Sequence, residues 1–298
     1  MKISYFRKSV ILIDGHCYAY RIYYGQIKNN KKINLKEKFI KNILYVVKKI
    51  ILKYQPKKII IIFDNKKKSF RDKIFKKYKK NRNPIPKILK KYIKDLQSIL
   101  VNIGIPIFCI PYVEADDVIG TLSKIIEKNG DVVLIVTSDK DLTQLINKNI
   151  YILNIIDKKI INFHQVKKKY GVYPNLIVDL LSLVGDPSDN IPGVKGIGKK
   201  TAVQLLNNIG CIKKIYKNYH KIYMLNFRNK KNIVKRLLEG EKMANLSYKL
   251  AKIKLNVICS KEYKKNNLYE LYKPCKYNNI KYINIIYEIK KNIINSIL

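Results

Sequence analysis

The sequence of 298 residues is poor in acidic side chains and has no tryptophan: 21 Asp and Glu stand against 62 Lys and Arg, which gives a formal net charge of +41. An excess of positive charge on this scale indicates an anionic partner, most often nucleic acid. The alternative is a biased genome, because the abundant Lys, Asn, Ile and Tyr have A+T-rich codons. We assign roughly half of the charge to that bias, so the composition alone decides little.

Cysteine pairs and long apolar runs are also absent. The sequence contains no C-x-x-C pair, which argues against a zinc site or a disulfide framework and favours reduced thiols in a cytoplasmic protein. No apolar stretch reaches the length of a membrane span, and the N-terminus leads into a strand-like run without a signal peptide. The five cysteines are Cys17, Cys109, Cys211, Cys259 and Cys275.

Short apolar runs alternate with helical patterns along the first half of the chain. Residues 10–13 form a buried strand that a turn at Asp14-Gly15 is expected to end. Continuous apolar strands separated by helices predict an α/β fold, with a mostly parallel sheet flanked by helices on both faces. The other expected strands span 58–63, 105–110, 132–136 and 151–153, and the expected helices span 35–53 and 114–128.

The few acids are concentrated where such a sheet binds ligands. Asp14, Asp64 and Asp139 each follow an expected strand, and ligands of parallel sheets bind beyond the carboxyl ends of the strands. Oxygen ligands suit Mg²⁺ or Mn²⁺, whereas Zn²⁺ prefers His and Cys. The full set of candidate metal ligands is Asp14, Asp64, Glu114, Asp116, Asp117, Asp139, Asp141, Asp186 and Asp189.

Nine carboxylates brought together without metal would repel one another, and two cations about 4 Å apart would relieve that repulsion while clamping a phosphodiester. Individual members have a structural alternative. The three acids at the start of the helix 114–128 are favoured there by capping and by the helix dipole. Asp189 and Asp14-Gly15 are also typical of turns. The joint pattern is what favours a metal site.

Residues 66–97 are strongly basic and are expected not to pack against a core. Within 66–82, Arg71, Lys79 and Arg82 are suited to phosphates, and the interleaved aromatics, including Tyr78, to stacking on unpaired bases. The spacing of Arg71, Tyr78 and Arg82 places them on one helical face. The alternative is a solvated helix in a lysine-rich protein.

A glycine-rich loop, residues 185–198, separates two expected helices at 175–185 and 199–208. Its glycines are expected to adopt positive φ and to let the backbone approach a ligand, and the next helix presents its N-terminus to a phosphate. The candidate DNA-binding residues of this region are Gly193, Lys195, Gly196, Gly198, Lys199 and Lys200, to which we add Arg71.

From residue 10 to about residue 255 the sequence resembles the 5′-nuclease family, which includes the 5′→3′ exonuclease domain of bacterial DNA polymerase I, phage 5′ exonucleases and flap endonucleases. The resemblance implies a PIN-like nuclease core over 1–172 with a basic helical arch at 66–97. It further implies a helix-turn-helix-type, helix–hairpin–helix-like duplex-binding subdomain over 173–260, which leaves a tail, 261–298, of unknown role. The matching stretches are ILIDG (11–15), YAYRIYYG (18–25), FDNKKKSFRDKIFKKYKKNR (63–82), VEADDVIGTL (113–122), TSDKDLTQL (137–145) and GDPSDNIPGVKGIGKKTA (185–202).

By position, the resemblance implies two divalent cations, Mg²⁺ or Mn²⁺, and a K⁺ ion on the carbonyls of loop 185–198. It places Asp14, Asp64, Glu114 and Asp116 around one divalent cation, Asp139, Asp141, Asp186 and Asp189 around the other, and Asp117 close by. It assigns catalytic contacts with the scissile phosphate to Arg21, Tyr78, Lys79 and Arg82.

The sequence departs from the family after Asp14-Gly15, where small hydroxyl residues are usual and His16 and Cys17 stand here. No polymerase domain follows, so we expect the exonuclease part alone, acting as a monomer beside a separate DNA polymerase. The expected substrate is DNA with a 5′ end, nick or flap, or an RNA primer–DNA hybrid, in replication and repair. A PIN-type ribonuclease and a non-catalytic duplex-binding relic are the alternatives. The loop 185–198 with the basic segment argues against the first, and the complete set of acids against the second.

Overall fold

The computed structural model describes residues 3–28 and 34–257, and its centre is a sheet of six strands. The strand order is β3-β2-β1-β4-β5-β6, and all neighbours run parallel except β6, which is antiparallel to β5. The predicted α/β fold with a mostly parallel sheet is confirmed. The strands are β1 (Val10–Asp14), β2 (Lys58–Ile62), β3 (Ile107–Phe108), β4 (Val133–Thr137), β5 (Ile150–Asn154) and β6 (Ile160–Ile161).

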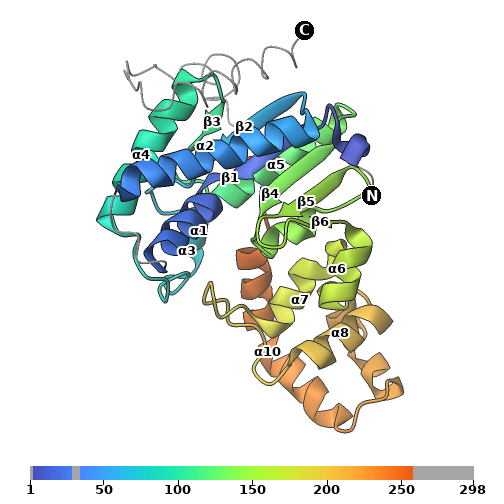
Figure 1. Cartoon of the computed structure of the whole chain (residues 1–298). Coiled ribbons are helices and arrows are strands. Elements are labelled where there is room, and N and C mark those ends of the chain that lie inside the picture. The colour runs from blue at the N-terminus through green and yellow to red at the C-terminus, as the bar shows by residue number, and fades with distance from the viewer. Residues whose placement is uncertain (1–2, 29–33, 258–298) are drawn as a thin grey trace.

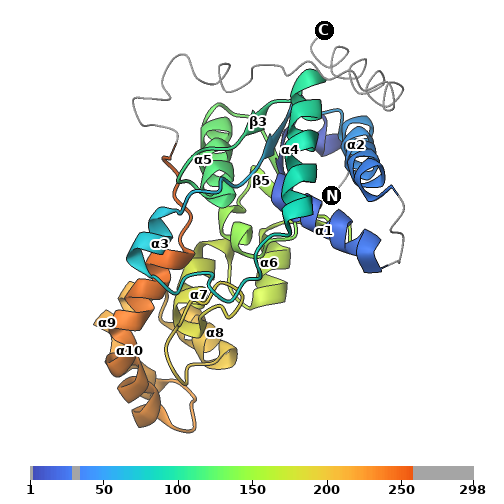
Figure 2. The ribbon, with the colours of Figure 1, turned by 90° about the vertical axis from the view of Figure 1, so that its left-hand side faces the viewer.

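Helices cover both faces of the sheet, because each central strand sends alternate side chains into two separate cores. In β1, Ile11 and Ile13 belong to the core on one face, and Val10 and Leu12 to the core on the other. The first core is closed by α1 (Gly15–Lys28), α2 (Leu35–Tyr54) and α4 (Lys87–Asn102), and the second by α5 (Ala115–Lys128) (Figure 1 and Figure 2).

The chain after β6 is helical and extends the second core away from the sheet (Figure 1). Helix α7 (Ile177–Val184), the loop 185–198 and α8 (Lys199–Asn208) form the expected helix–loop–helix element. The remaining helices of this part are α6 (Phe163–Tyr170), α9 (Ile212–Lys217) and α10 (Lys230–Ala251), with the 3-10 turns η3 (Pro174–Leu176) and η4 (Tyr219–Met224); the earlier part adds α3 (Phe70–Ile74), η1 (Ile3–Phe6) and η2 (Asp141–Leu145).

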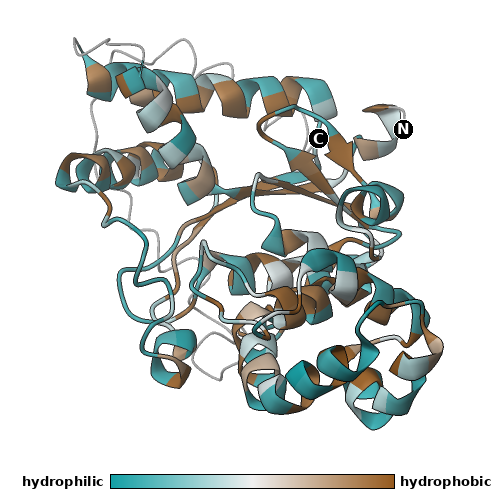
Figure 3. Ribbon diagram, turned by 90° about the horizontal axis from the view of Figure 1, so that it is seen from below, coloured by the Kyte–Doolittle hydropathy of each residue, from teal (hydrophilic) through white to brown (hydrophobic). Residues whose placement is uncertain are grey.

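Hydrophobic residues are concentrated on the strands and on the inner faces of the helices, as Figure 3 shows from below. Within residues 3–28 and 34–257, no helix combines the length and apolar character that crossing a membrane requires. The boundary between domains at residues 172 and 173 stays a prediction. The tail at 261–298 lies outside the described residues.

The expectation about the end of the first strand was wrong. The turn at Asp14-Gly15 is absent, because Gly15 is the first residue of α1. A Cβ atom at Gly15 would lie 2.6 Å from the ring of Phe63, so glycine lets helix and strand meet directly. Three cysteines, Cys17, Cys109 and Cys211, are free thiols in the described part of the chain.

The basic segment 66–97 is neither one helix nor wholly separate from the core. Helix α3 ends at Ile74, and turns follow up to residue 82, so the common helical face of Arg71, Tyr78 and Arg82 does not exist. From residue 87 onward the segment is α4, whose lysines face outward while Leu89 and Leu96 are fully buried. An amphipathic helix can bury one face however basic the other is.

Candidate active site

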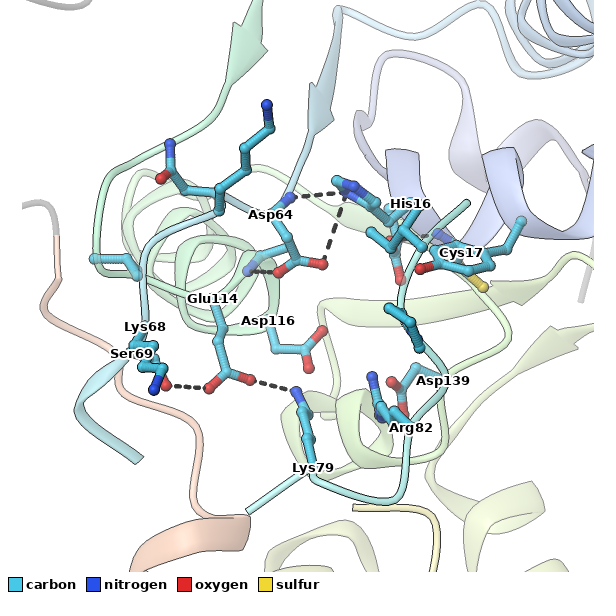
Figure 4. A pocket seen from close by; sticks show the side chains of 18 of the residues that line it. His16, Cys17, Asp64, Lys68, Ser69, Lys79, Arg82, Glu114, Asp116 and Asp139 are labelled. Carbon is cyan, nitrogen blue, oxygen red and sulfur yellow. Dashed lines mark hydrogen bonds and ion pairs between the residues drawn. The ribbon is translucent and has the colours of Figure 1, made fainter. Parts of the chain in front are cut away.

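The carboxyl ends of three adjacent strands, β2, β1 and β4, open into a cavity of about 890 Å³. Asp14 is the last residue of β1, and Asp64 and Asp139 follow β2 and β4 by two residues. Glu114 precedes α5 and Asp116 lies in its first turn. All five acids line the cavity, and Figure 4 shows four of them, Asp64, Glu114, Asp116 and Asp139, brought together there from three segments of the chain.

Hydrogen bonds hold the first two acids in fixed orientations. Asp14 accepts from the backbone N–H of Cys17 at 3.0 Å and from the Thr137 hydroxyl at 2.9 Å. Asp64 accepts from the backbone N–H of Ala115 at 2.8 Å, which ties the end of β2 to the start of α5. The carboxylates are therefore oriented by the scaffold itself.

Asp141, Asp186 and Asp189 lie beside the cavity. Asp141 is close enough to Asp139, Asp189 and Asp186 for their charges to raise its pKa, although burial contributes more to that shift. Oδ1 of Asp141 and Oδ2 of Asp186 are buried and accept no hydrogen bond from any described residue. A buried carboxylate oxygen without a partner is costly, so these two atoms fit a hard cation as ligand.

Basic side chains stand between the acids. Nζ of Lys79 lies 2.5 Å from Glu114 Oε2 and 3.6 Å from Asp189 Oδ2, so it bridges two acids that the resemblance assigns to different cations. Nζ of Lys140 lies 2.7 Å from Asp186 Oδ1. In this arrangement no three His, Cys, Asp or Glu side chains of residues 3–28 and 34–257 form a ready-made metal-ligand set.

The acids divide into two electrostatic classes. Burial, reinforced by neighbouring carboxylates, raises the pKa of Asp14 to about 7 and that of Asp141 to about 8, and it raises the pKa of Asp116 well above its usual value. Burial acts the same way on Glu114, but Lys79 and Arg71 outweigh it and lower its pKa to about 2. The negative charges of the first class must therefore be neutralised by bound protons or by bound cations.

The turn that carries Lys79 is fastened to the loop 185–198. Lys79 has φ of 52°, a left-handed conformation that costs a non-glycine residue about 1–2 kcal/mol. Its backbone N–H donates to the carbonyl of Asp189 at 2.9 Å, and the Asn190 amide donates to the carbonyl of Lys77 at 2.7 Å. The Arg82 guanidinium adds an ion pair with Asp189. These contacts hold a strained backbone and aim Lys79 and Arg82 at the acids.

Three predicted roles need correction. Arg71 is only 3% exposed and forms a two-pronged ion pair with Asp117, which is fully buried, so neither residue lines the cavity. Arg71 therefore cannot meet a phosphate, and Asp117 has no free oxygen to offer a metal ion. Tyr78 is 6% exposed, and its hydroxyl donates to Glu114 at 3.2 Å, so it cannot stack on a base. Arg21 is exposed and lines the cavity as expected.

Glycines shape the loop 185–198 at two of the three predicted positions. Gly193 and Gly196 have φ of 65° and 82°, and a Cβ at Gly193 would lie 2.4 Å from the backbone nitrogen of Gly185. Gly198 has an ordinary extended conformation with open space around it, so the expected positive φ was wrong there. The exposed lysines of this element are Lys195, Lys199 and Lys200.

Sequence reasoning missed several residues that orient the acids. The Nδ1 atom of His16 accepts from the backbone N–H of Asp64 at 2.9 Å, which makes Nδ1 the unprotonated nitrogen (Figure 4). The Ser69 hydroxyl donates to Glu114 at 2.6 Å. Lys140 stands between two candidate ligands in the stretch TSDKDL, and this position was the only signal for it.

Comparison with known proteins places this geometry in a family. Residues 9–171 match the model of the 5′–3′ exonuclease N-terminal resolvase-like domain, and residues 172–273 match that of the 5′–3′ exonuclease C-terminal SAM fold. The chain belongs to the 5′–3′ exonuclease family. The resemblance of the six sequence stretches is thus confirmed, and the family descriptions agree with the sheet and the helical part described above.

Relatives in the 5′–3′ exonuclease family cover most of the chain. A 5′–3′ exonuclease of Buchnera aphidicola subsp. Schizaphis graminum is 47% identical over 252 residues, 84% of this chain and 88% of its own length. DNA polymerase I of Pseudomonas aeruginosa is 36% identical over 249 residues, which cover 83% of this chain but 27% of the polymerase. Among solved structures, the zinc-bound 5′-exonuclease of bacteriophage T5 has a TM-score of 0.69 at 20% identity, covering 97% of this chain and 99% of its own.

Proposed function

We propose that this protein hydrolyses phosphodiester bonds of DNA at or near a 5′ end, as a 5′→3′ exonuclease and 5′-flap endonuclease that uses two divalent cations, Mg²⁺ or Mn²⁺. The observation that carries the proposal is the pair of buried, unpartnered oxygens on Asp141 and Asp186 beside a cavity of acids with raised pKa values. Such a donor set suits hard cations. Relatives named 5′–3′ exonuclease support the reaction, and a T5 flap endonuclease solved with DNA and metal ions supports the cofactor.

The proposal divides the acids between the two cations in the way that the resemblance implies. When bound, the cations would supply an attacking water of lowered pKa and charge stabilisation at the leaving oxygen. Asp14 and Asp64, held by Thr137 and Ala115, keep their oxygens aimed at the cavity. We assign Asp14, Asp64, Glu114 and Asp116 to one cation and Asp139, Asp141, Asp186 and Asp189 to the other.

Lys79, Arg82 and Arg21 act on the phosphate. Lys79 and Arg82 line the same cavity and pair with Glu114 and Asp189, so a phosphate that reaches these acids would meet both basic side chains. Interactions that strengthen as charge develops raise turnover more than affinity. Tyr78 acts on this arrangement through its hydroxyl, which orients Glu114.

The exposed lysines of loop 185–198 and α8 would hold the duplex backbone, with K⁺ on loop carbonyls as the resemblance predicts. We place the reaction in removal of RNA primers and flaps during replication and repair, beside a separate DNA polymerase. A relative that is a DNA polymerase I supports this pathway. The cytoplasmic location and the monomeric state remain part of the proposal.

Cleavage of a labelled 5′-flap duplex tests the proposed function. Asp139→Ala and Asp186→Ala should abolish cleavage in Mg²⁺ and leave DNA binding largely intact. The reason is that binding rests on contacts of Lys and Arg side chains and of backbone groups with phosphate. Asp157→Ala, which removes an exposed acid that does not line the cavity, is the matched control. Near wild-type cleavage by either site variant, or cleavage that survives EDTA, would refute the assignment. Preferential cutting of single-stranded RNA would favour the ribonuclease alternative.

A further inference from the structure

A buried ion pair lies directly behind the proposed active site. The guanidinium of Arg71 donates to both carboxylate oxygens of Asp117, at 2.7 and 2.8 Å. Of its three remaining N–H groups, two donate to the backbone carbonyls of Leu250 at 2.7 Å and Lys252 at 2.9 Å, and the third donates to Glu114. All five N–H groups of the Arg71 guanidinium therefore have acceptors among the described residues, and the two carbonyls come from residues about 180 positions further along the chain.

The segment 250–257, which we call the strap, consists of the last two residues of α10 and the chain that follows them back to the nuclease core. The backbone N–H of Lys254 donates to Asp117 at 2.8 Å, and that of Ile253 donates to the Gln144 side chain at 3.0 Å. Gln144 in turn donates to the carbonyl of Ala251 at 3.1 Å. The strap thereby joins α5 and η2, the two elements that carry Asp116 and Asp141.

Arg71 connects the strap to the basic segment. It lies in α3, which begins at the Ser69 cap, and its guanidinium also reaches Glu114 Oε1 at 3.3 Å. Seven residues later Tyr78 packs against Leu250 at the start of the strap. One side chain thus fixes, at the same time, the acid Glu114 and the start of the turn that presents Lys79. In Figure 2, α3 lies beside the end of α10.

We propose that Arg71 is a positioning residue of the nuclease site, which sets Lys79 against Glu114 by anchoring α3 to Asp117 and to the strap. The inference rests on the proposed function. Surface arginines of the basic segment would instead contact DNA, as the sequence alone suggested for Arg71. The two roles differ measurably, because a phosphate contact contributes to the salt dependence of binding and a buried anchor does not.

Arg71→Met should lower the single-turnover rate of 5′-flap cleavage by roughly tenfold or more, since a displaced Lys79 no longer meets the phosphate. The slope of log K against log salt for DNA binding should stay unchanged. Because the single variant leaves Asp117 as a lone buried charge, Arg71→Met/Asp117→Asn provides a second variant without that charge. Asp179→Asn is the matched control, since Asp179 is a buried carboxylate that accepts from the backbone N–H of Ile212 in the helical part.

A double-mutant cycle with Lys79→Ala separates positioning from a general loss of stability. If Arg71 acts through Lys79, then Lys79→Ala should reduce the rate far less in the Arg71→Met or Arg71→Met/Asp117→Asn background than in the wild type. In the Asp179→Asn background its effect should be undiminished. The rates are measured at saturating enzyme and at a temperature where circular dichroism shows every variant folded.

If the rate reductions caused by Arg71→Met and Lys79→Ala simply multiply in the double variant, within about twofold, the inference is overturned while the proposed function stands. A salt slope that falls by about one unit in Arg71→Met would also overturn it, because it would make Arg71 a phosphate contact. Absence of Mg²⁺-dependent cleavage by the wild-type protein would overturn the proposed function, and the inference with it.

Discussion

Removing divalent cations should make the protein lose stability as the pH rises from 6.5 to 8. The pKa of Asp14 is raised from 3.8 to about 7 and that of Asp141 from 3.8 to about 8, so the folded state binds more protons than the unfolded state in this range. The free energy of unfolding then falls with pH, by up to about 1.4 kcal/mol per unit for each group. Integrating the two titrations over this window gives a loss of roughly 2 kcal/mol.

Other shifted groups do not mask this loss. The lowered pKa of Glu114 contributes stability that is already complete above its ordinary value of 4.5, so it adds no slope here. The lowered pKa of His16 contributes a rise in stability with pH that is largely complete at its ordinary value of 6.5, which is why the window begins there. Bound Mg²⁺ competes with the protons and should flatten the profile.

Urea unfolding followed by circular dichroism, at pH 6.5, 7.25 and 8 with EDTA or with excess Mg²⁺, measures the effect. Asp141→Asn should remove much of the slope in EDTA, because it replaces the group with the higher of the two pKa values by a neutral one. An EDTA profile that is flat or rises with pH would refute the reasoning. So would an equal fall in Mg²⁺, since the acids would then not be the metal ligands.

Three further predictions concern the basic segment, the glycine-rich loop and the substrate. Lys79→Ala should slow single-turnover cleavage about a hundred- to thousandfold with little loss of DNA binding. Lys80→Ala, which changes the exposed neighbour, should leave both the rate and the binding unchanged. Equal rates for the two variants would refute the catalytic role of Lys79. Gly193→Ala should destabilise by at least about 1 kcal/mol in thermal unfolding, because its Cβ would collide with Gly185, while Gly198→Ala should be nearly neutral; similar values would contradict the loop geometry. DNA binding should weaken with salt by about 0.9 log units per phosphate contact and favour a free 5′ end; equal binding and cleavage of blunt, nicked and flapped duplexes would indicate charge alone.

The sheet and the gathering of acids at its edge were predictable because they depend on local patterns. An apolar run followed by Asp determines where Asp14, Asp64 and Asp139 lie once the strands are parallel and adjacent. Sequence order also placed Glu114 and Asp116 at the start of a helix. Short-range rules were sufficient for these five acids, which all line the cavity.

The sequence could not predict which basic residues are buried, because burial depends on partners far away in the chain. Arg71 and Arg82 look alike in the sequence, yet Arg71 is buried by residues near 117 and 250 whereas Arg82 remains exposed. The packed helix α4 was not predicted for a different reason. Its apolar positions, including Leu89 and Leu96, are diluted by outward-facing lysines, so composition suggested a solvated arch where periodicity would have indicated a packed helix.

The path of the strap limits how the chain can be divided. The family descriptions meet between residues 171 and 172, which suggests two modules that could be exchanged between proteins. The strap, however, lies against the first module: Ile253 and Leu255 fill the space above Gly120, and Lys254 completes the bonding of Asp117. A protein cut at residue 171 would expose apolar surface on α5 and leave the Arg71 pair short of its two carbonyl acceptors. The two modules therefore have to be recombined together, with the strap kept intact.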